Sequence, residues 1–292
     1  MIRHDGGALK TTRRRFLKGI GLWAGGGLLA GYPFFIERYL VQVNLYDIPV
    51  PRLPKSFEGF RIVHLTDLHY GLLVPEAYIG AVIDKANAIP RDLTVCTGDY
   101  VQDAPGQMDG VFPHLGRLKA KNGVLSTLGN HDSWVEFDKA VGWLDRIGQN
   151  LRHRAVPIQR NGERIWIGGA GDLNEDIVGI DKAFAGTPPD DCKIALAHTP
   201  DTADVPFRTR IDLMISGHTH GGQVIVPFYG PPILPVKNKR YASGFIRTPR
   251  MNLFISRGIG WAILPVRLNC PPEIAVLTLT REKEKLRGRT DA

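Results

Sequence analysis

The chain has 292 residues, of which 43% are hydrophobic and 23% are charged. This length and composition suit one large domain or two small ones with a sizeable core, and they exclude the disordered and fibrous classes. The three cysteines are odd in number and far apart, which argues against a disulfide framework or a thiolate metal site.

The formal net charge of +8 lies mostly at the two ends of the chain. Residues 1–18 carry six basic side chains against Asp5, and residues 281–292 carry five basic against three acidic ones. Residues 19–280 are therefore nearly neutral and contain no long basic stripe of the kind that follows a phosphate backbone. We expect no nucleic-acid partner.

The first forty residues are interpreted as a targeting segment. The motif TRRRFLK at residues 12–18 is similar to the twin-arginine export signal, and an uncharged apolar run follows from residue 19 to 36. This run is nearly long enough to span a bilayer, so an ordinary membrane helix is the alternative. The small-residue cleavage pattern that ends at Ala30 is poor, so two alternatives stay open: a signal that is cleaved, or an anchor that stays attached. We expect export by the twin-arginine machinery to the periplasm or the extracytoplasmic face of the cytoplasmic membrane.

Residues 41–59 contain several prolines and are interpreted as an extended connector. The domain itself is expected over residues 60–280, and residues 281–292 form a charged tail.

Strand and helix patterns alternate at the start of this domain. Residues 60–66 and 92–98 are short apolar runs rich in β-branched residues, and residues 76–89 between them have apolar side chains at helical spacing. Further helices are predicted over residues 108–120 and 134–148. Further strands are predicted at residues 122–129, 163–169, 193–198, 211–217, 223–227, 252–256 and 273–279. This order predicts an α/β protein with mixed sheets and outer helices.

Carboxylate, amide and imidazole side chains follow several of the predicted strands. A lone histidine is more often a packing residue than a ligand, but five histidines in strand-end loops are hard to explain by packing alone. Because sites assemble in the loops beyond the carboxyl ends of strands, we expect five strand ends to converge. The side chains in these positions are Asp67, His69, Asp99, Asn130, His131, His198, His218 and His220.

These donor types restrict the chemistry. Carboxylate, imidazole and amide oxygen without thiolate suit Mn, Fe or Zn, and two carboxylates with several imidazoles can hold two such ions. A pair of divalent ions lowers the pKa of a bridging water and neutralises the charge that develops during displacement at phosphorus. One carboxylate must bridge the two ions, and Asp99, preceded by Gly98, is the candidate.

Five motifs in chain order carry a resemblance to a known family. They are DLH at residues 67–69, GDYVQD at 98–103, GNHD at 129–132, AHTPD at 197–201 and GHTHGGQ at 217–223. In order and spacing they resemble the motifs of the calcineurin-like metallophosphoesterases. Residues 256–279 are similar to the C-terminal segment of the bacterial branch that includes exported phosphodiesterases of the YkuE and YaeI type. The resemblance implies a four-layer αββα sandwich of two mixed sheets flanked by helices.

The resemblance also implies roles for individual residues. One metal ion would be held by Asp67, His69, Asp99 and His220, and the second by Asp99, Asn130, His198 and His218. His131 would protonate or stabilise the leaving oxygen, with Asp132 orienting it. The implied enzyme is a dinuclear metal-dependent phosphoesterase that cleaves a phosphodiester or pyrophosphate bond through a metal-bridging hydroxide.

Two further features leave alternatives open. Arg257 could reach a substrate phosphate or could be a structural arginine. Residues 226–236, VPFYGPPILPV, are apolar and uncharged. They form either a buried proline-rich loop or a loop that faces a membrane or an acyl chain.

The export signal, the ligand set and this apolar segment together favour an envelope or lipid-linked phosphoester substrate and association with the membrane. A phosphomonoesterase is an alternative, because the same pair of metals serves both reactions. A pyrophosphatase of the UDP-2,3-diacylglucosamine type is a narrower alternative, although its substrate lies on the cytoplasmic side. A non-catalytic membrane-anchored scaffold is a third, although no expected ligand is missing. The sequence specifies neither the natural substrate nor the metal pair nor the oligomeric state.

Overall fold

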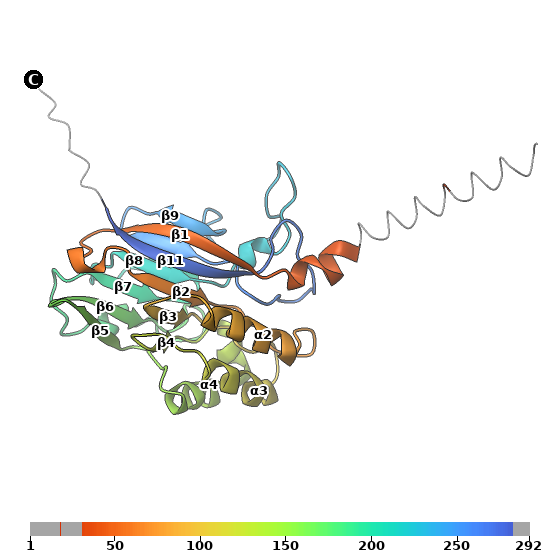
Figure 1. The fold of residues 1–292 in the computed structure, drawn as a ribbon, viewed down its shortest axis with the longest axis horizontal. Coiled ribbons are helices and arrows are strands. Elements are labelled where there is room, and N and C mark those ends of the chain that lie inside the picture. The colour runs from red at the N-terminus through yellow and green to blue at the C-terminus, as the bar shows by residue number, and fades with distance from the viewer. Residues whose placement is uncertain (1–17, 19–30, 283–292) are drawn as a thin grey trace, which may run out of the picture.

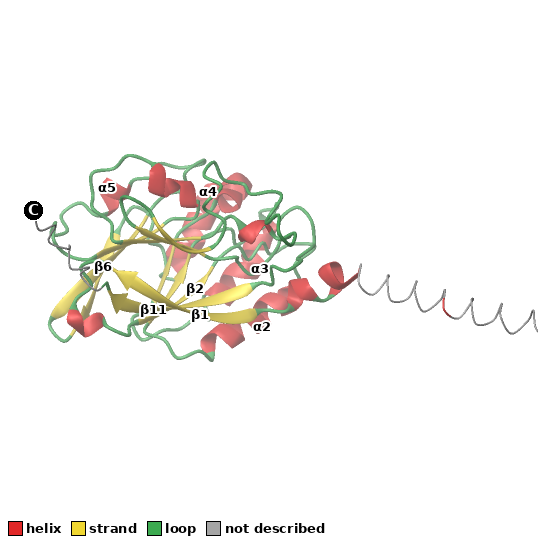
Figure 2. Cartoon of the chain, turned by 90° about the horizontal axis from the view of Figure 1, so that it is seen from above, coloured by secondary structure: helices red, strands yellow, loops and turns green. Residues whose placement is uncertain are grey.

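The computed structural model describes residue 18 and residues 31–282. Most of the twin-arginine motif, most of the apolar run up to residue 36 and most of the charged tail lie outside the described residues. Figures 1 and 2 show strands in the centre of the molecule, with helices α2, α3 and α4 gathered on one side of them. Within the described part of the chain, no helix has both the length and the apolar character needed to cross a membrane.

The first sheet has five strands in the order β1-β11-β2-β3-β4. They are β1 (Gln42–Val50), β2 (Arg61–Leu65), β3 (Leu93–Cys96), β4 (Val124–Ser126) and β11 (Glu273–Arg281). The sheet is mixed, because β1 runs parallel to β11, β11 runs antiparallel to β2, and β2, β3 and β4 are parallel to one another. The helices that connect or follow the parallel strands are α2 (Glu76–Asn87), α3 (Gly106–Leu115) and α4 (Asn130–Arg146).

The second sheet has six strands in the order β5-β6-β7-β8-β10-β9. They are β5 (Ala155–Arg160), β6 (Glu163–Gly169), β7 (Lys193–Leu196), β8 (Leu213–Ser216), β9 (Gly244–Arg247) and β10 (Asn252–Ile255). The inner four strands are parallel, and β5 and β9 pair antiparallel at the two edges. The short helix α5 (Ile180–Ala183) and the 3-10 helix η3 (Pro200–Asp204) accompany this sheet.

Alternation along the strands divides the apolar side chains among three cores. In β2, Val63 and Leu65 pack with residues of α2, α3 and α4, whereas Ile62 faces the second sheet. In β8, Ile215 lies in the core between the sheets, whereas Met214 packs with residues of α5 on the outer side. Three cores separate four layers, so the predicted α/β class and αββα sandwich are confirmed.

The segment predicted to be an extended connector, residues 41–59, differs from that interpretation. It contains β1, which pairs with β11 along nine residues and buries Ile48 and Val50 between the sheets. The prolines are compatible with a strand here because β1 lies at the edge of the sheet, where proline is tolerated.

Residues 223–227, predicted to be a strand, also differ. They form a loop with two isolated β-bridges, one between Val224 and Leu268 and the other between Val226 and Gly230. The apolar run in this segment therefore does not mark a buried strand, and Val226 is exposed.

Candidate metal centre and active site

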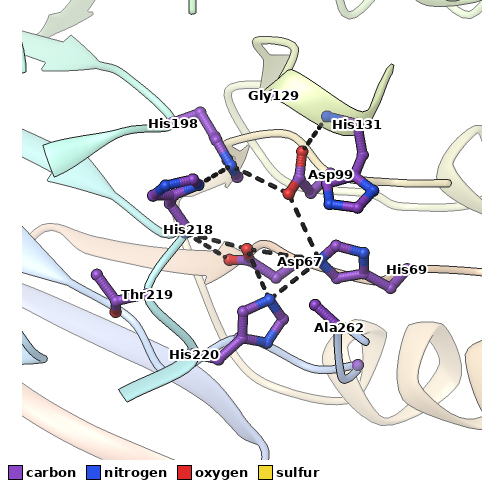
Figure 3. Close-up of polar contacts among 12 residues, drawn as sticks. Asp67, His69, Asp99, Gly129, His131, His198, His218, Thr219, His220 and Ala262 are labelled. Carbon is purple, nitrogen blue, oxygen red and sulfur yellow. Dashed lines mark hydrogen bonds and ion pairs between the residues drawn. The ribbon is translucent and has the colours of Figure 1, made fainter. Parts of the chain in front are cut away.

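The predicted metal ligands come together at the carboxyl ends of parallel strands from both sheets. The first sheet contributes Asp67 and His69 after β2, Asp99 after β3 and Asn130 after β4, and the second contributes His198 after β7 and His218 and His220 after β8. Figure 3 shows the carboxylates and imidazoles pointing toward one another from the two sides. The predicted convergence of five strand ends is therefore present in the structure.

Five of these ligands have a left-handed backbone conformation. The positive φ angles are 55° at Asp67, 47° at His69, 54° at Asp99, 70° at His218 and 53° at His220. Non-glycine residues in this region are uncommon and cost on the order of 1 kcal/mol each, so they persist only where the surroundings enforce them. Their concentration at one site indicates a geometry maintained for function.

The first cluster consists of Asp67, His69 and His220. The Nε2 atoms of the two imidazoles are 3.0 Å apart, and Asp67 Oδ1 lies 3.4 Å from His220 Nε2 and 3.9 Å from His69 Nε2. The carboxylate of Asp67 also accepts a 3.0 Å hydrogen bond from the backbone N–H of His218. One oxygen and two nitrogens thus face a common point that a cation can occupy.

The second cluster consists of Asp99, His198 and His218. His198 Nε2 lies 3.2 Å from Asp99 Oδ2 and 3.1 Å from His218 Nδ1. The outward nitrogens of both rings face backbone carbonyls, with His198 Nδ1 at 2.7 Å from Thr97 O and His218 Nε2 at 3.0 Å from Pro235 O. These carbonyls accept from the outward N–H groups and so direct the opposite nitrogens toward the cluster.

Asp99 lies between the two clusters. Its Oδ2 is 3.4 Å from His69 Nε2 and 3.2 Å from His198 Nε2. The backbone N–H of His131 donates to Asp99 Oδ1 at 2.9 Å. The preceding residue, Asn130, has a buried Oδ1 without a hydrogen-bond partner, as expected of an oxygen that binds a cation. A donor set of carboxylate, imidazole and amide oxygen fits two divalent ions with Asp99 shared between them.

Burial keeps three of the imidazoles neutral, which is the form that binds metals. Desolvation lowers the pKa of His69 to about 3 and that of His218 to about 4, and it holds the pKa of His220 well below its usual value. His198 differs, because the charge of Asp99 outweighs burial and raises its pKa to about 10. Burial likewise opposes the charge of Asp99, but His198 holds the pKa of this carboxyl well below its usual range.

His131 lies at the edge of the centre. Its ring packs edge-on against that of His69, with centroids 4.6 Å apart. His131 Nδ1 lies 2.6 Å from the carbonyl oxygen of Gln102, to which it donates. This hydrogen bond fixes the ring and leaves Nε2 to exchange a proton.

Asp132 differs from the role implied by the resemblance, because its carboxylate does not hold the His131 ring. It accepts the backbone N–H groups of Asp99 at 2.8 Å, Tyr100 at 2.8 Å and Gly129 at 2.9 Å. The reason is its place in the first turn of α4, where a carboxylate caps the free N–H groups and reaches the adjacent loop. Asp132 is thus a positioning residue for Asp99.

Glycines allow the close approach of the loops that carry the ligands. A Cβ on Gly217 would overlap the carboxylate of Asp67 and the hydroxyl of Thr66. A Cβ on Gly98, whose φ is 95°, would overlap the backbone of Gly129. Glycine is therefore required at both positions by space, and at Gly98 also by conformation.

Arg257 has the structural role that was one of its two alternatives. Its Nη2 pairs at 3.2 Å with Oε2 of the buried Glu273, and its backbone N–H donates to Glu273 Oε1 at 2.8 Å. Sequence reasoning missed a different arginine. Arg267 is fully buried, donates to the carbonyl oxygen of Gly260, and lies 3.4 Å from His220 Nδ1, so it supports the segment beside this ligand.

Comparison with known proteins agrees with this geometry. The family model described as calcineurin-like phosphoesterase matches residues 60–222. The chain belongs to this metallophosphoesterase family. Members use two divalent metal ions and hydrolyse phosphoester bonds, so this phosphoesterase is a metal-dependent hydrolase.

Two bacterial relatives match the phosphoesterase along most of its length. It is 33% identical over 288 residues to the uncharacterized metallophosphoesterase YkuE of Bacillus subtilis, covering 92% of this chain and 98% of that protein. It is 32% identical over 276 residues to the phosphodiesterase YaeI of Escherichia coli, and this match covers 92% of this chain and 99% of that protein. Among solved structures, a dimetal phosphatase from Danio rerio superposes with a TM-score of 0.42 at 10% identity, covering 77% of this chain and 100% of that one.

Proposed function

We propose that this phosphoesterase cleaves a phosphodiester or pyrophosphate bond in an envelope or lipid-linked substrate, outside the cytoplasmic membrane. The observation that carries the reaction is the pair of ligand clusters joined by Asp99, with His131 at their edge. The similarity to a protein named phosphodiesterase supports a diester over a monoester. The twin-arginine motif at residues 12–18 supports export of the folded protein.

The residues of the centre have separate tasks. Two divalent ions would supply Lewis acidity that activates water and neutralises charge on phosphorus-bound oxygens. Asp67, His69, Asp99 and His220 would hold one of them, and Asp99, Asn130, His198 and His218 the other. His131, fixed at Nδ1 by Gln102, presents Nε2 to exchange a proton with the leaving oxygen. Asp132 keeps Asp99 in place through the backbone.

An envelope substrate is further supported by the loop at residues 226–236. Most of this segment is exposed, with Phe228, Tyr229 and Ile233 directed to solvent, and only its end at Val236 is buried. Its base contacts the centre, because the carbonyl oxygen of Pro235 accepts from His218. An apolar surface this close to the ligands suits a substrate that carries an acyl chain or lies in a bilayer.

The test is a comparison of matched aryl substrates. Purified protein is loaded in turn with Mn, Fe or Zn, and its turnover of bis(p-nitrophenyl) phosphate is compared with that of p-nitrophenyl phosphate. We expect the diester to be hydrolysed faster than the monoester. The variant Asp99→Asn should reduce turnover by a factor on the order of a hundred or more, and it should also bind less metal. Faster hydrolysis of the monoester would make the protein a phosphomonoesterase. Two bound metals without turnover of any ester, including nucleotide-sugar lipids, would favour the scaffold.

A further inference from the structure

Three segments that are distant in sequence meet beside the metal centre and present apolar side chains to solvent. They are residues 31–40, 223–236 and 262–269. Figure 1 shows the middle loop projecting in cyan beside the blue third loop and the orange N-terminal helical segment. The side chains at their tips are each at least 59% exposed, and we call them the apolar rim: Phe35, Phe228, Tyr229, Ile233, Ile263 and Leu264.

Hydrogen bonds join the three segments into one surface. The side chain of Gln223 accepts from the N–H of Ala262 at 2.6 Å and donates to its carbonyl at 3.1 Å. The N–H of Leu268 donates to the carbonyl of Gln223 at 2.9 Å, and that of Arg267 donates to the carbonyl of Pro33 at 3.1 Å. Because Gln223 ends the GHTHGGQ motif, the rim is held directly by the segment that carries His218 and His220.

Two residues of the rim have a strained backbone. Phe228 has a φ of 66° and Ile263 a φ of 61°, a region that bulky and β-branched residues avoid. Glycine or asparagine would be relaxed at these positions, and neither exposed side chain adds to a core. Retaining large apolar side chains at such tips indicates a role outside folding.

Basic side chains follow the middle segment of the rim in the chain. Residues 224–240 contain Lys237, Lys239 and Arg240 and no acidic residue, and all three are exposed. The continuous described stretch, residues 31–282, begins at this surface with Gly31. In the sequence before it, residues 19–30 are uncharged and residues 1–18 are basic. Apolar tips flanked by cations complement a bilayer with anionic headgroups.

We propose that the apolar rim docks onto an anionic phospholipid bilayer. Docking there would place His218, whose Nε2 donates to Pro235 O at 3.0 Å, next to the lipid headgroups. This inference rests on the proposed function, because docking would bring a lipid-linked substrate to the metal centre. Vesicle binding itself requires no turnover, so the two can fail separately.

The test uses a fluorophore that reports its surroundings. Since Cys96, Cys192 and Cys270 are buried, a cysteine placed at an exposed position can be labelled selectively. Full-length Phe228→Cys is labelled with an environment-sensitive dye and mixed with vesicles of phosphatidylglycerol and phosphatidylethanolamine. Ile177→Cys is the matched control, because Ile177 is 73% exposed but lies before α5, outside the rim.

We expect at least a threefold rise in fluorescence at position 228, reduced by salt, and no change at position 177. An equal response at both positions, or an equal response to vesicles of phosphatidylcholine alone, would overturn the proposal. So would a rise at position 228 that depends on protein concentration without vesicles, because a second copy of the chain would then cover the rim.

A second variant separates binding from folding. In an Ile233→Cys reporter chain, adding Phe228→Asn and Ile263→Asn should lower the vesicle response at least threefold while Tm stays equal or rises, because asparagine tolerates positive φ. An undiminished response would contradict the proposal. If even the unaltered chain shows no turnover while the vesicle response persists, the proposed function fails and the docking surface stands.

Discussion

The Nε2 atoms of His69 and His220 lie 3.0 Å apart, although the two residues follow strands of different sheets. Burial keeps both rings neutral by lowering their pKa values. The two neutral imidazoles face each other with their Nε2 atoms, and Asp67 Oδ1 lies 3.4 Å from the Nε2 of His220. Together these three atoms form a site for a cation. The centre is therefore built at the junction of the two sheets and depends on how they are packed.

The two histidines of GHTHGGQ should serve different ions, because His220 belongs to the cluster of Asp67 and His218 to that of His198. We expect His220→Ala and His218→Ala each to reduce bound metal from about two ions per chain to about one, and turnover by at least about a hundredfold. Mass spectrometry measures the number of bound ions, and titration calorimetry measures the affinity for them. His114→Ala, which removes a surface contact to Glu76, should keep both ions. Retention of both ions in either ligand variant would contradict the assignment.

His131→Ala should retain both metals and lose turnover by a factor on the order of 10² to 10⁴, because it removes the proposed proton donor and none of the proposed metal ligands. The loss should be larger for substrates with poor leaving groups, which need protonation most. Rates for a series of aryl and alkyl diesters, with metal content measured alongside, check this. The same loss for every leaving group, or the loss of an ion, would argue against a role as general acid.

Asp132→Asn should lower the free energy of unfolding by about 1–3 kcal/mol, because one carboxylate oxygen is replaced by an NH₂ group that faces N–H donors. Metal affinity should fall with it, since Asp99 is held by these bonds. Denaturant unfolding and calorimetry measure the two effects, with exposed Asp138→Asn in the same helix as control. Unchanged stability together with an altered pH profile of turnover would instead indicate that Asp132 acts on the reaction through His131.

Glu273→Gln should destabilise the fold in a pH-dependent way. The buried Glu273 carboxylate accepts from Asn44 at 2.7 Å and Tyr46 at 2.8 Å, and it pairs with Arg257. Burial opposes its charge, but Arg257 and these hydrogen bonds prevail and lower its pKa below the ordinary 4.5.

Because the folded pKa is below the unfolded value, the stabilisation from Glu273 is complete above pH 4.5 and is lost as the pH falls through the folded pKa. At pH 7 the variant should be less stable by about 3 kcal/mol. Denaturation curves from pH 7 to pH 3 should show the difference narrowing below pH 4.5. A constant difference over this range would mean that the charge of Glu273 does not contribute.

The cluster of carboxylate and imidazole groups could be predicted from sequence because its signals are local. A strand followed within a few residues by a carboxylate or imidazole needs no knowledge of the rest of the chain, and five such loops in order specify both donors and family. Helices α2, α3 and α4 and most of the strands were predictable for the same reason, since apolar spacing is a property of short segments. Strand β1 was not recognised, because its place in the sheet comes from pairing with β11 at the other end of the chain.

Tertiary structure decided the relationships that depend on contacts between distant segments. The partners of Asp132 and Arg257, the exposure of residues 226–236 and the hydrogen bond from His218 to Pro235 are all of this kind. Sequence determines which groups a loop offers, because side-chain chemistry is local. Only packing determines which groups face each other, because hydrogen bonds and burial require segments far apart in the chain to meet.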